Sequence, residues 1–294
     1  MLAPDTLLRE RYRITYVVDQ QPDGLVYRAF DSETTRRVLL CALSQPAAFA
    51  LGDVGVLATQ VVAARGPRLL ALDNHFAHED CYYLVCGDPE GHDLERVARG
   101  RGSPLPEAEV LGLVAQLCAT VAQLHQHAPP LLLGDLRPSD LWSDDEQRLW
   151  LTPFALVRRS RLAGSPYCAP ELTTAEDEPT PASDVYALGA LCYQLLTGWA
   201  PPAAEQRAVG VPLNPPRTLN AHISALVERV VLRSLAPEPS QRYPQVHALH
   251  AALTSPQHSD GVSATSSPLT SPPPASPPPA SPPLASPPPA SPSP

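Results

Sequence analysis

Short apolar stretches with β-branched and aromatic residues dominate the first third of the chain. They fall at residues 12–18, 24–30, 36–43 and 81–86. Runs of this length and composition predict β-strands, so a small sheet is expected here. Between the third and fourth runs, residues 48–64 have the apolar content of one helix, although two glycines within them disfavour it.

In the following part of the chain the apolar residues take up the helical spacing. Residues 106–126 repeat apolar positions every three or four residues after an SPLP start, which predicts a helix. A second helix is predicted at 183–198, with Ser183 as its N-cap and Gly198 at its end. A third is predicted at 223–235.

A strand-rich first part followed by a helix-rich second part predicts a two-lobed α+β architecture. We expect a small β-rich N-terminal lobe at residues 1–88 and a larger helical C-terminal lobe at 89–254. Residues 255–294 are mostly Pro, Ser and Ala, so they are predicted to be a disordered tail. From Ser271 the tail repeats SPPPA, which favours an extended polyproline II conformation, as a spacer or as a ligand for a proline-binding module.

Composition excludes several classes of function. The formal net charge is −9, so there is no basic footprint for nucleic acid. All 21 basic residues counted as Lys or Arg are Arg, which excludes any mechanism that needs an amine side chain. No apolar run is long enough to span a bilayer and the N-terminus lacks a signal-peptide pattern, so we expect a cytoplasmic protein without a membrane span. The six cysteines form no CxxC pair, which argues against a zinc or redox site.

Six segments carry recognisable motifs in a fixed order. They are RYRITYVVDQQPDGLVYRAFDSETTRRVLL, YYLVCGDPEGHDL, LLLGDLRPSDLW, LWLTPFAL, GSPYCAPEL and SDVYALGALCYQLLTG. In this order they resemble the glycine-rich loop and following strand, hinge, catalytic loop, DFG segment, APE segment and central helix of bacterial-type serine/threonine protein kinases. The resemblance covers about residues 8–252. It implies the two-lobed protein kinase-like fold.

Several residues that this family uses for structure are present. The resemblance pairs Glu171 of the APE segment with Arg242 in a buried ion pair. It gives Asp184, at the start of the central helix, the role of holding the catalytic-loop backbone. Phe154 is the one residue of the DFG triplet that is kept.

The residues that would hold the phosphates of ATP are replaced. The three loop glycines correspond to Asp19, Gln21 and Gly24, and the lysine corresponds to Cys41. Phosphoryl transfer in this family depends on these groups and on a glutamate that holds the lysine. That glutamate has no convincing counterpart, because Asp53 is the only acidic residue between positions 42 and 72.

The metal positions are replaced as well. The aspartate of the DFG triplet is Pro153, which has no side-chain oxygen for a cation, and its glycine is Ala155. Asp140 stands at the catalytic-loop asparagine, where one carboxylate alone makes a poor magnesium site, and Arg137 replaces the catalytic-loop lysine. We therefore expect no metal.

The positions that would surround adenine also differ from the family. Pro89 falls on the hinge residue whose N–H would bind the base, and proline has no N–H. The small residue above the base becomes Leu39, and the leucine below it becomes Trp142. Together with Val26, these positions predict a filled pocket, so no bound cofactor is expected.

Switching by phosphorylation is not expected either. Residues 156–168 contain no Thr, and Gly134 replaces the arginine that would read an activating phosphate. The residue before it, where the family has His, is Leu133. Ser160 and Ser165 are serines of a loop that we expect to be exposed.

Asp135 keeps the position of the catalytic base. A lone carboxylate does not catalyse without a held electrophile, so Asp135 is interpreted as a vestigial residue kept for hydrogen bonds. The leading hypothesis is a pseudokinase that acts as a signalling scaffold or protein-binding module, with other kinases or proline-binding modules as candidate partners.

Two alternatives stay open. One is a serine/threonine protein kinase or kinase-fold transferase that binds ATP and magnesium in an atypical way, with Asp135 as base and Asp140 as metal ligand. The other is a passive domain that displays the repeated SPPPA tail as its functional ligand.

Overall fold

The computed structural model describes residues 1–21, 24–44, 51–101, 104–144, 146, 148–157, 164–172 and 177–255. One compact unit spans Met1–Pro256. The predicted tail lies outside the described residues beyond Ser255.

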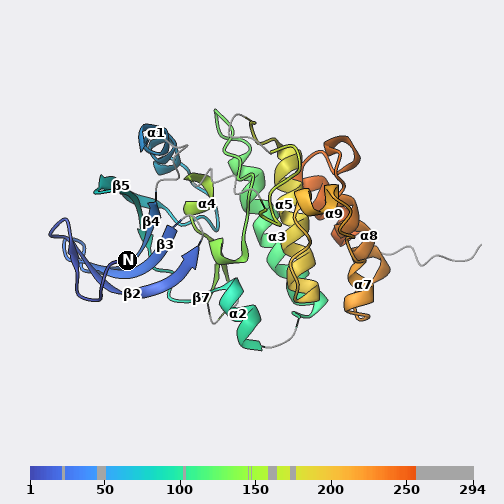
Figure 1. Ribbon diagram of the computed structural model, residues 1–294, viewed down its shortest axis with the longest axis horizontal. Coiled ribbons are helices and arrows are strands. Elements are labelled where there is room, and N and C mark those ends of the chain that lie inside the picture. Colours follow the sequence, from blue (N-terminus) through green and yellow to red (C-terminus); the bar gives the residue numbers. More distant parts are fainter. Residues whose placement is uncertain are drawn as a thin grey trace, which may run out of the picture. The chain divides into compact units, whose positions relative to one another are not determined.

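Six antiparallel strands form one sheet in the order β1-β2-β3-β4-β6-β5 (Figure 1). Their bounds are β1 Leu7–Leu8, β2 Tyr12–Gln21, β3 Gly24–Asp31, β4 Arg36–Ser44, β5 Leu72–His78 and β6 Cys81–Gly87. The four apolar runs correspond to β2, β3, β4 and β6. The apolar pattern does not predict β5, because its sequence LDNHFAH mixes apolar residues with Asp, Asn and two His.

Alternation along the central strands gives this sheet two apolar faces. On one face the aromatic rings of Tyr12, Phe76 and Tyr83 stack and belong to a separate hydrophobic cluster. The other face, here called the inner face, belongs to a cluster that continues without interruption into the helical half. The two halves of the folded unit therefore share one core.

The C-terminal half is built around two long helices, α3 (Glu107–Leu124) and α5 (Pro181–Thr197). Helix α3 packs against α5 and α9, and α5 packs against α8. The remaining helices are α2 Leu94–Arg101, α4 Phe154–Val157, α6 Ala204–Ala208, α7 Pro216–Leu219, α8 Ala225–Ser234 and α9 Val246–Thr254, with 3₁₀ turns η1 Pro138–Asp140 and η2 Pro239–Gln241. A small sheet joins β7 His92–Asp93, β8 Leu141–Ser143 and β9 Leu149–Leu151.

The predicted two-lobed α+β architecture is the one observed. In Figure 1 the blue sheet and the green-to-orange helices lie on either side of α4. Helix α1 (Leu51–Val62) covers β5 and β6. It lies within the predicted helix at 48–64, of which residues 48–50 fall outside the described part of the chain.

The start of α5 differs from its prediction. Its N-cap is Thr180, whose side-chain oxygen accepts a hydrogen bond from the N–H of Ser183. The side-chain oxygen of Ser183, in the first turn, accepts a hydrogen bond from the N–H of Thr180. Ser183 is therefore the N3 residue of a capping box and not the N-cap. A helix-compatible Pro181 at the first position explains the three-residue shift. The end of the helix is as predicted, with Gly198 in the left-handed conformation at φ 80°.

Among the described helices, only α3 is long and apolar enough to cross a membrane by length and composition. In this fold its apolar residues, Val110, Leu113, Val114, Leu117 and Val121 among them, are buried against neighbouring helices. The apolar stripe of α3 is thus accounted for by the core of the C-terminal half.

Candidate functional site

Asp184 holds the backbone of the catalytic-loop segment. It is fully buried at the start of α5, where its Oδ1 accepts the N–H groups of Leu133 at 3.0 Å and Gly134 at 2.7 Å. Its Oδ2 lies 2.7 Å from Nε2 of His125, the residue that caps α3. A buried carboxylate needs such partners. The geometry is the one that the resemblance implies for Asp184, whereas nothing in the sequence pattern singled out His125.

Asp135 is buried, and both of its carboxylate oxygens are engaged. Oδ2 accepts hydrogen bonds from Nη2 of Arg137 at 2.9 Å and from Nε at 3.1 Å. Oδ1 accepts a hydrogen bond from the hydroxyl of Ser165 at 3.0 Å. Asp135 therefore ties the catalytic-loop segment to the APE segment, a role that needs no substrate.

The expectation that Ser165 lies in an exposed loop is wrong. Its side chain is buried, because its hydroxyl turns inward to donate to Asp135. Ser160 and residues 158–163 fall outside the described part of the chain.

The residues at the metal positions do not fit a magnesium ion. Asp140 is buried, and its Oδ2 accepts the backbone N–H of Arg137 at 3.0 Å. Pro153 supplies no side-chain oxygen, and the residue before it, Thr152, has a buried hydroxyl without a hydrogen-bond partner in the described structure. Magnesium prefers an octahedral shell of carboxylate oxygens and waters. Within the described residues, no three His, Cys, Asp or Glu side chains lie together as a metal site.

Phe154 and Ala155 belong to the hydrophobic core. They begin α4, in which all four side chains are buried, and α4 packs against α1. Helix α1 carries no glutamate. The place of the metal-binding segment and its partner helix is thus occupied by an apolar helix pair.

The positions that the resemblance places around a nucleotide are here called the inter-lobe slot: Val26, Leu39, Cys41 and Trp142. Their exposed fractions are 5%, 0%, 2% and 2%, respectively. All four belong to the one cluster that spans both lobes. These four side chains are therefore buried between the lobes.

Gly24 has a structural reason to be glycine. A Cβ at this position would lie 2.2 Å from the carbonyl oxygen of Ala42, because β3 approaches β4 closely there. The retained loop glycine is thus explained without a phosphate. Asp19 lies in β2 opposite Val26, and Gln21 ends that strand; residues 22–23 between β2 and β3 are outside the described structure.

The linker between the lobes follows β6. Pro89 lies there half-buried, between Asp88 and Glu90, and offers no N–H to a ligand. Asp88 is instead bound by Arg28 of β3, through hydrogen bonds of 2.6 and 2.9 Å. The sequence pattern did not identify Arg28, because a single arginine in a strand normally points to solvent.

Glu171 and Arg242 form the ion pair that the resemblance implies. Arg242 Nη2 lies 2.6 Å from Glu171 Oε2, and Nη1 lies 2.8 Å from Oε1. The Arg242 side chain is 0% exposed and also donates to three backbone carbonyls, those of Ala236, Ala182 and Pro237. Burial opposes the charge of Glu171, but the hydrogen bonds from Arg242 lower the pKa of this carboxyl below its usual value. We call Asp184, His125, Glu171 and Arg242 the anchor network.

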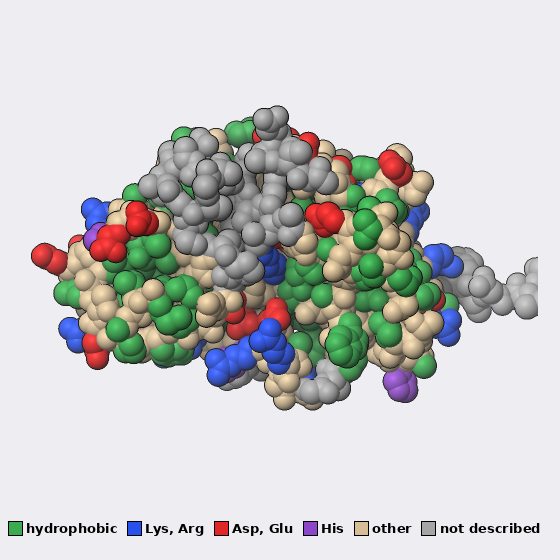
Figure 2. Space-filling model, in the orientation of Figure 1, with side chains coloured by type: hydrophobic (Ala, Val, Ile, Leu, Met, Phe, Trp, Pro, Cys, Tyr) green, Lys and Arg blue, Asp and Glu red, His purple; other side chains and the backbone are tan. Residues whose placement is uncertain are grey.

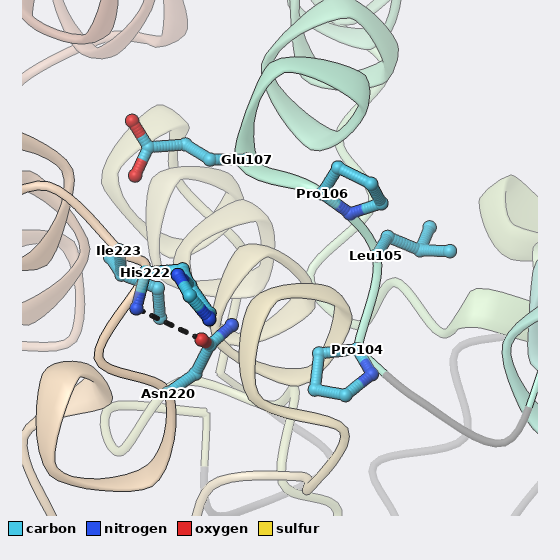
Figure 3. Close-up of a pocket in the computed structure, with 7 residues that line it drawn as sticks. All are labelled: Pro104, Leu105, Pro106, Glu107, Asn220, His222 and Ile223. Atoms are coloured by element: carbon cyan, nitrogen blue, oxygen red, sulfur yellow. Dashed lines mark hydrogen bonds between the residues drawn. The ribbon is translucent and has the colours of Figure 1, made fainter.

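A separate cavity of about 400 Å³ lies between the start of α3 and the loop before α8 (Figure 3). Pro104 and Pro106 form part of its wall. Two of its polar side chains hold neighbouring backbone: Glu107 Oε2 accepts the N–H of Ser224 at 2.6 Å, and Asn220 Oδ1 accepts the N–H of His222 at 3.1 Å. The cavity brings together no nucleophile and base.

Positively charged side chains gather at the lower centre of Figure 2, where Figure 1 places α2. This helix carries Arg96, Arg99 and Arg101. Arg99 pairs with Glu95 at 2.6 Å, and Arg101 pairs with Glu109 at 2.8 Å. Solvated pairs of this kind contribute little to stability and mark no anion site.

Comparison with known proteins agrees with these motifs. The family model described as the protein kinase domain matches residues 26–252. The chain is 25% identical to the serine/threonine-protein kinase PrkC of Bacillus subtilis over 66% of its own length and 32% of that protein. It is 26% identical to the serine/threonine-protein kinase PknG of Mycolicibacterium smegmatis over 86% of its own length and 33% of that protein. The chain thus spans about a third of the length of these relatives.

Among solved structures, the PknI kinase domain of Mycobacterium tuberculosis superposes with a TM-score of 0.68 at 20% identity. The match covers 86% of this chain and 98% of that one. At this identity the likeness concerns the fold.

Proposed function

The chain belongs to the protein kinase family, and from this premise we propose that it is a pseudokinase that works as a protein-binding module. The observation that carries the proposal is that the charged groups of the family are replaced at and beside the inter-lobe slot, which is buried and apolar. Cys41 stands where the family has its lysine, Pro153 where it has its metal aspartate, and both lie beside apolar side chains that solvent does not reach. Binding of a triphosphate needs positive charge and a metal at this place.

The hydrogen bonds of Asp135 support the same conclusion. A general base has to reach the proton that it abstracts. Asp135 is buried and its oxygens accept from Arg137 and Ser165, so its retention is explained by structure. The alternative, an ATP-dependent kinase with Asp135 as base and Asp140 as metal ligand, would have to use carboxylates that already accept these internal hydrogen bonds.

A protein partner is proposed because the slot offers no small-molecule site. Four exposed large apolar side chains follow one another along the chain between α5 and α8: Trp199, Val209, Val211 and Leu219. Exposed apolar side chains of this size are candidate contacts for a protein partner. Trp199 is the largest of them and is 71% exposed.

The experiment that tests the proposal is calorimetric titration of the whole chain with ATP, with and without magnesium, together with its melting temperature. We expect no heat of binding and no shift at millimolar ATP. A ligand at a hundred times its Kd would stabilise the fold by about 2.7 kcal/mol, so binding would be seen. Magnesium-dependent binding, with hydrolysis that is lost in Asp135→Asn, would overturn the proposal. Asn is chosen because it can still accept the hydrogen bond from Ser165.

The SPPPA repeat favours a second candidate function, display of a ligand for proline-binding modules. Polyproline segments bind aromatic-lined grooves with little loss of conformational entropy. A chain that ends at residue 254 should then lose binding to a panel of purified proline-binding domains while it keeps its melting temperature. Equal binding of both chains would exclude this function.

A further inference from the structure

Arg28 is a charged residue on the inner face of the sheet. It lies in β3 opposite Leu39 of β4, and its side chain is only 15% exposed. A buried guanidinium has to find partners, and each of its nitrogens has one. Nε and Nη2 donate to the two carboxylate oxygens of Asp88 at 2.6 and 2.9 Å, and Nη1 donates to the hydroxyl of Tyr16 at 2.7 Å.

The same side chain reaches the C-terminal lobe. Nη2 of Arg28 donates a further hydrogen bond of 3.1 Å to the carbonyl of Gly91, and the guanidinium carbon lies 5.5 Å from the centre of the Trp142 ring of β8. Bidentate pairing and contact with an aromatic face are the two strong interactions of arginine. Burial opposes the charge, but the hydrogen bonds to Asp88 and Tyr16 raise the pKa of Arg28, so it is charged at neutral pH.

The linker lies directly against the C-terminal lobe at this point. A Cβ on Gly91 would lie 2.1 Å from the carbonyl oxygen of Ser143 in β8. Only glycine permits this approach. The sheet, the linker and β8 therefore meet at Arg28. Arg28 contacts the linker and Trp142, and the resemblance places both of these against adenine.

We propose that Arg28 is an internal substitute for a bound nucleotide, holding the two lobes in one closed arrangement through Asp88, Gly91 and Trp142. The inference rests on the proposed function, since a nucleotide would compete with Arg28 for the linker and for Trp142. A domain closed by its own side chain presents a constant surface to a partner, and a preorganised surface binds with a smaller entropic cost.

A second link between the lobes does not involve Arg28. The N–H of Leu70 donates to the carbonyl of Leu151 at 2.9 Å, and the N–H of Leu151 donates to the carbonyl of Arg68 at 2.7 Å. Loss of the Arg28 contacts is therefore expected to loosen the lobes without separating them.

The cysteines provide a readout of this opening. Cys41 and Cys86 lie on the inner face of the sheet, whereas Cys118 and Cys192 lie within α3 and α5; all four are buried and reduced. Opening of the lobes exposes the first pair only, whereas global unfolding exposes all four. Half-buried Cys81 serves as a reference that labels in every sample.

The experiment compares Arg28→Met with Arg37→Met in the whole chain without ATP. Arg37 is a matched control, because it pairs with Glu90 of the same linker on the surface, with side chains 62% and 69% exposed. Labelling by N-ethylmaleimide is followed at each cysteine by mass spectrometry. In Arg28→Met we expect labelling of Cys41 and Cys86 to accelerate at least tenfold, with Cys118 and Cys192 unchanged; Arg37→Met should label like the parent chain.

Two results would overturn the inference. One is an unchanged rate at Cys41 and Cys86 in Arg28→Met, and the other is an equal acceleration at Cys41, Cys86, Cys118 and Cys192, which indicates general destabilisation. Asp88→Asn should reproduce the effect of Arg28→Met, and the double variant should add little, because both remove the same interaction. ATP binding by the parent chain would contradict the proposed function, whatever the labelling pattern shows.

Discussion

Two regions meet at the segment that contains Asp135. Toward the N-terminal sheet lies the inter-lobe slot, where Leu39, Cys41 and Trp142 are apolar and buried. Toward the C-terminal helices lies the anchor network, where Asp184 and Glu171 have hydrogen-bond partners within the chain. A charge in the anchor network is stabilised by groups of the chain itself. A charge at position 41 would need a partner of its own, as Arg28 has in Asp88, and without a partner a buried ion is costly. This difference between the two regions is the one that the proposed pseudokinase predicts, because its fold is kept while it binds no nucleotide.

Removal of a charge from the anchor network should have the largest effect. Arg242→Met leaves Glu171 without its charged partner and three carbonyls without the Arg242 donor, so we expect a loss of about 3–5 kcal/mol in the free energy of unfolding. Denaturant titration measures this change. Glu171→Gln, at a side chain that is 25% exposed, should cost less. A loss below about 1 kcal/mol in Arg242→Met would mean that the two regions do not differ in this way.

Addition of a charge to the slot is the reverse test. Cys41→Lys restores the lysine of the family, but the described slot positions offer it no acidic side chain. An unpaired buried ammonium loses its proton or destabilises the fold, and we expect a loss of roughly 3 kcal/mol or more at neutral pH, smaller at pH 10. Cys41→Met is the control for the added volume and should show no such dependence on pH. Full stability of Cys41→Lys at pH 7 would indicate that the slot is wet or contains a counter-ion.

Low pH should remove the contribution to the free energy of unfolding that comes from carboxylates paired with arginines of the chain. The hydrogen bonds from Arg11 lower the pKa of Asp31 from 3.8 to about 2. A carboxyl whose pKa is lower in the folded state than in the unfolded state stabilises the fold at pH values above its unfolded-state pKa. This contribution is lost as the pH falls toward the folded-state pKa. We expect the pair to contribute about 2 kcal/mol above pH 4 and to lose it between pH 4 and 2. Arg11→Met should flatten the decline of unfolding free energy in this window, and parallel curves for the two chains would contradict the assignment.

The smallest effect is expected at Thr152, whose hydroxyl is buried without a partner in the described structure. Thr152→Val removes this group at nearly constant shape and should be neutral or stabilising by up to about 1 kcal/mol. Thr120→Val is the matched control, because the hydroxyl of Thr120 donates to the carbonyl of Gln116 at 3.1 Å, and its loss should destabilise by about 1 kcal/mol. A clear loss in Thr152→Val would show that a water or another ligand binds the hydroxyl.

Much of the architecture can be predicted from the pattern of the chain. Short apolar runs rich in β-branched and aromatic residues identify β2, β3, β4 and β6, and helical spacing identifies α3, α5 and α8, because each of these elements buries apolar side chains. The pattern fails at β5, where the strand forms through pairing with β6 and not through its own apolar content. It also misplaces the N-cap of α5, since either Ser183 or Thr180 could cap a helix and the backbone decides between them.

The sequence by itself determined which chemical groups are present at the family's motif positions: no lysine, no metal aspartate and no hinge N–H. Residue identity suffices for such statements, because a side chain that lacks a charge or an oxygen lacks it in every conformation. Only the tertiary structure decided what the remaining polar groups do. Arg28, His125 and Ser165 are ordinary residues in their local sequence, and their partners Asp88, Asp184 and Asp135 lie 60, 59 and 30 residues away. Pairing over such distances depends on how the lobes pack, and that is a property of the whole fold.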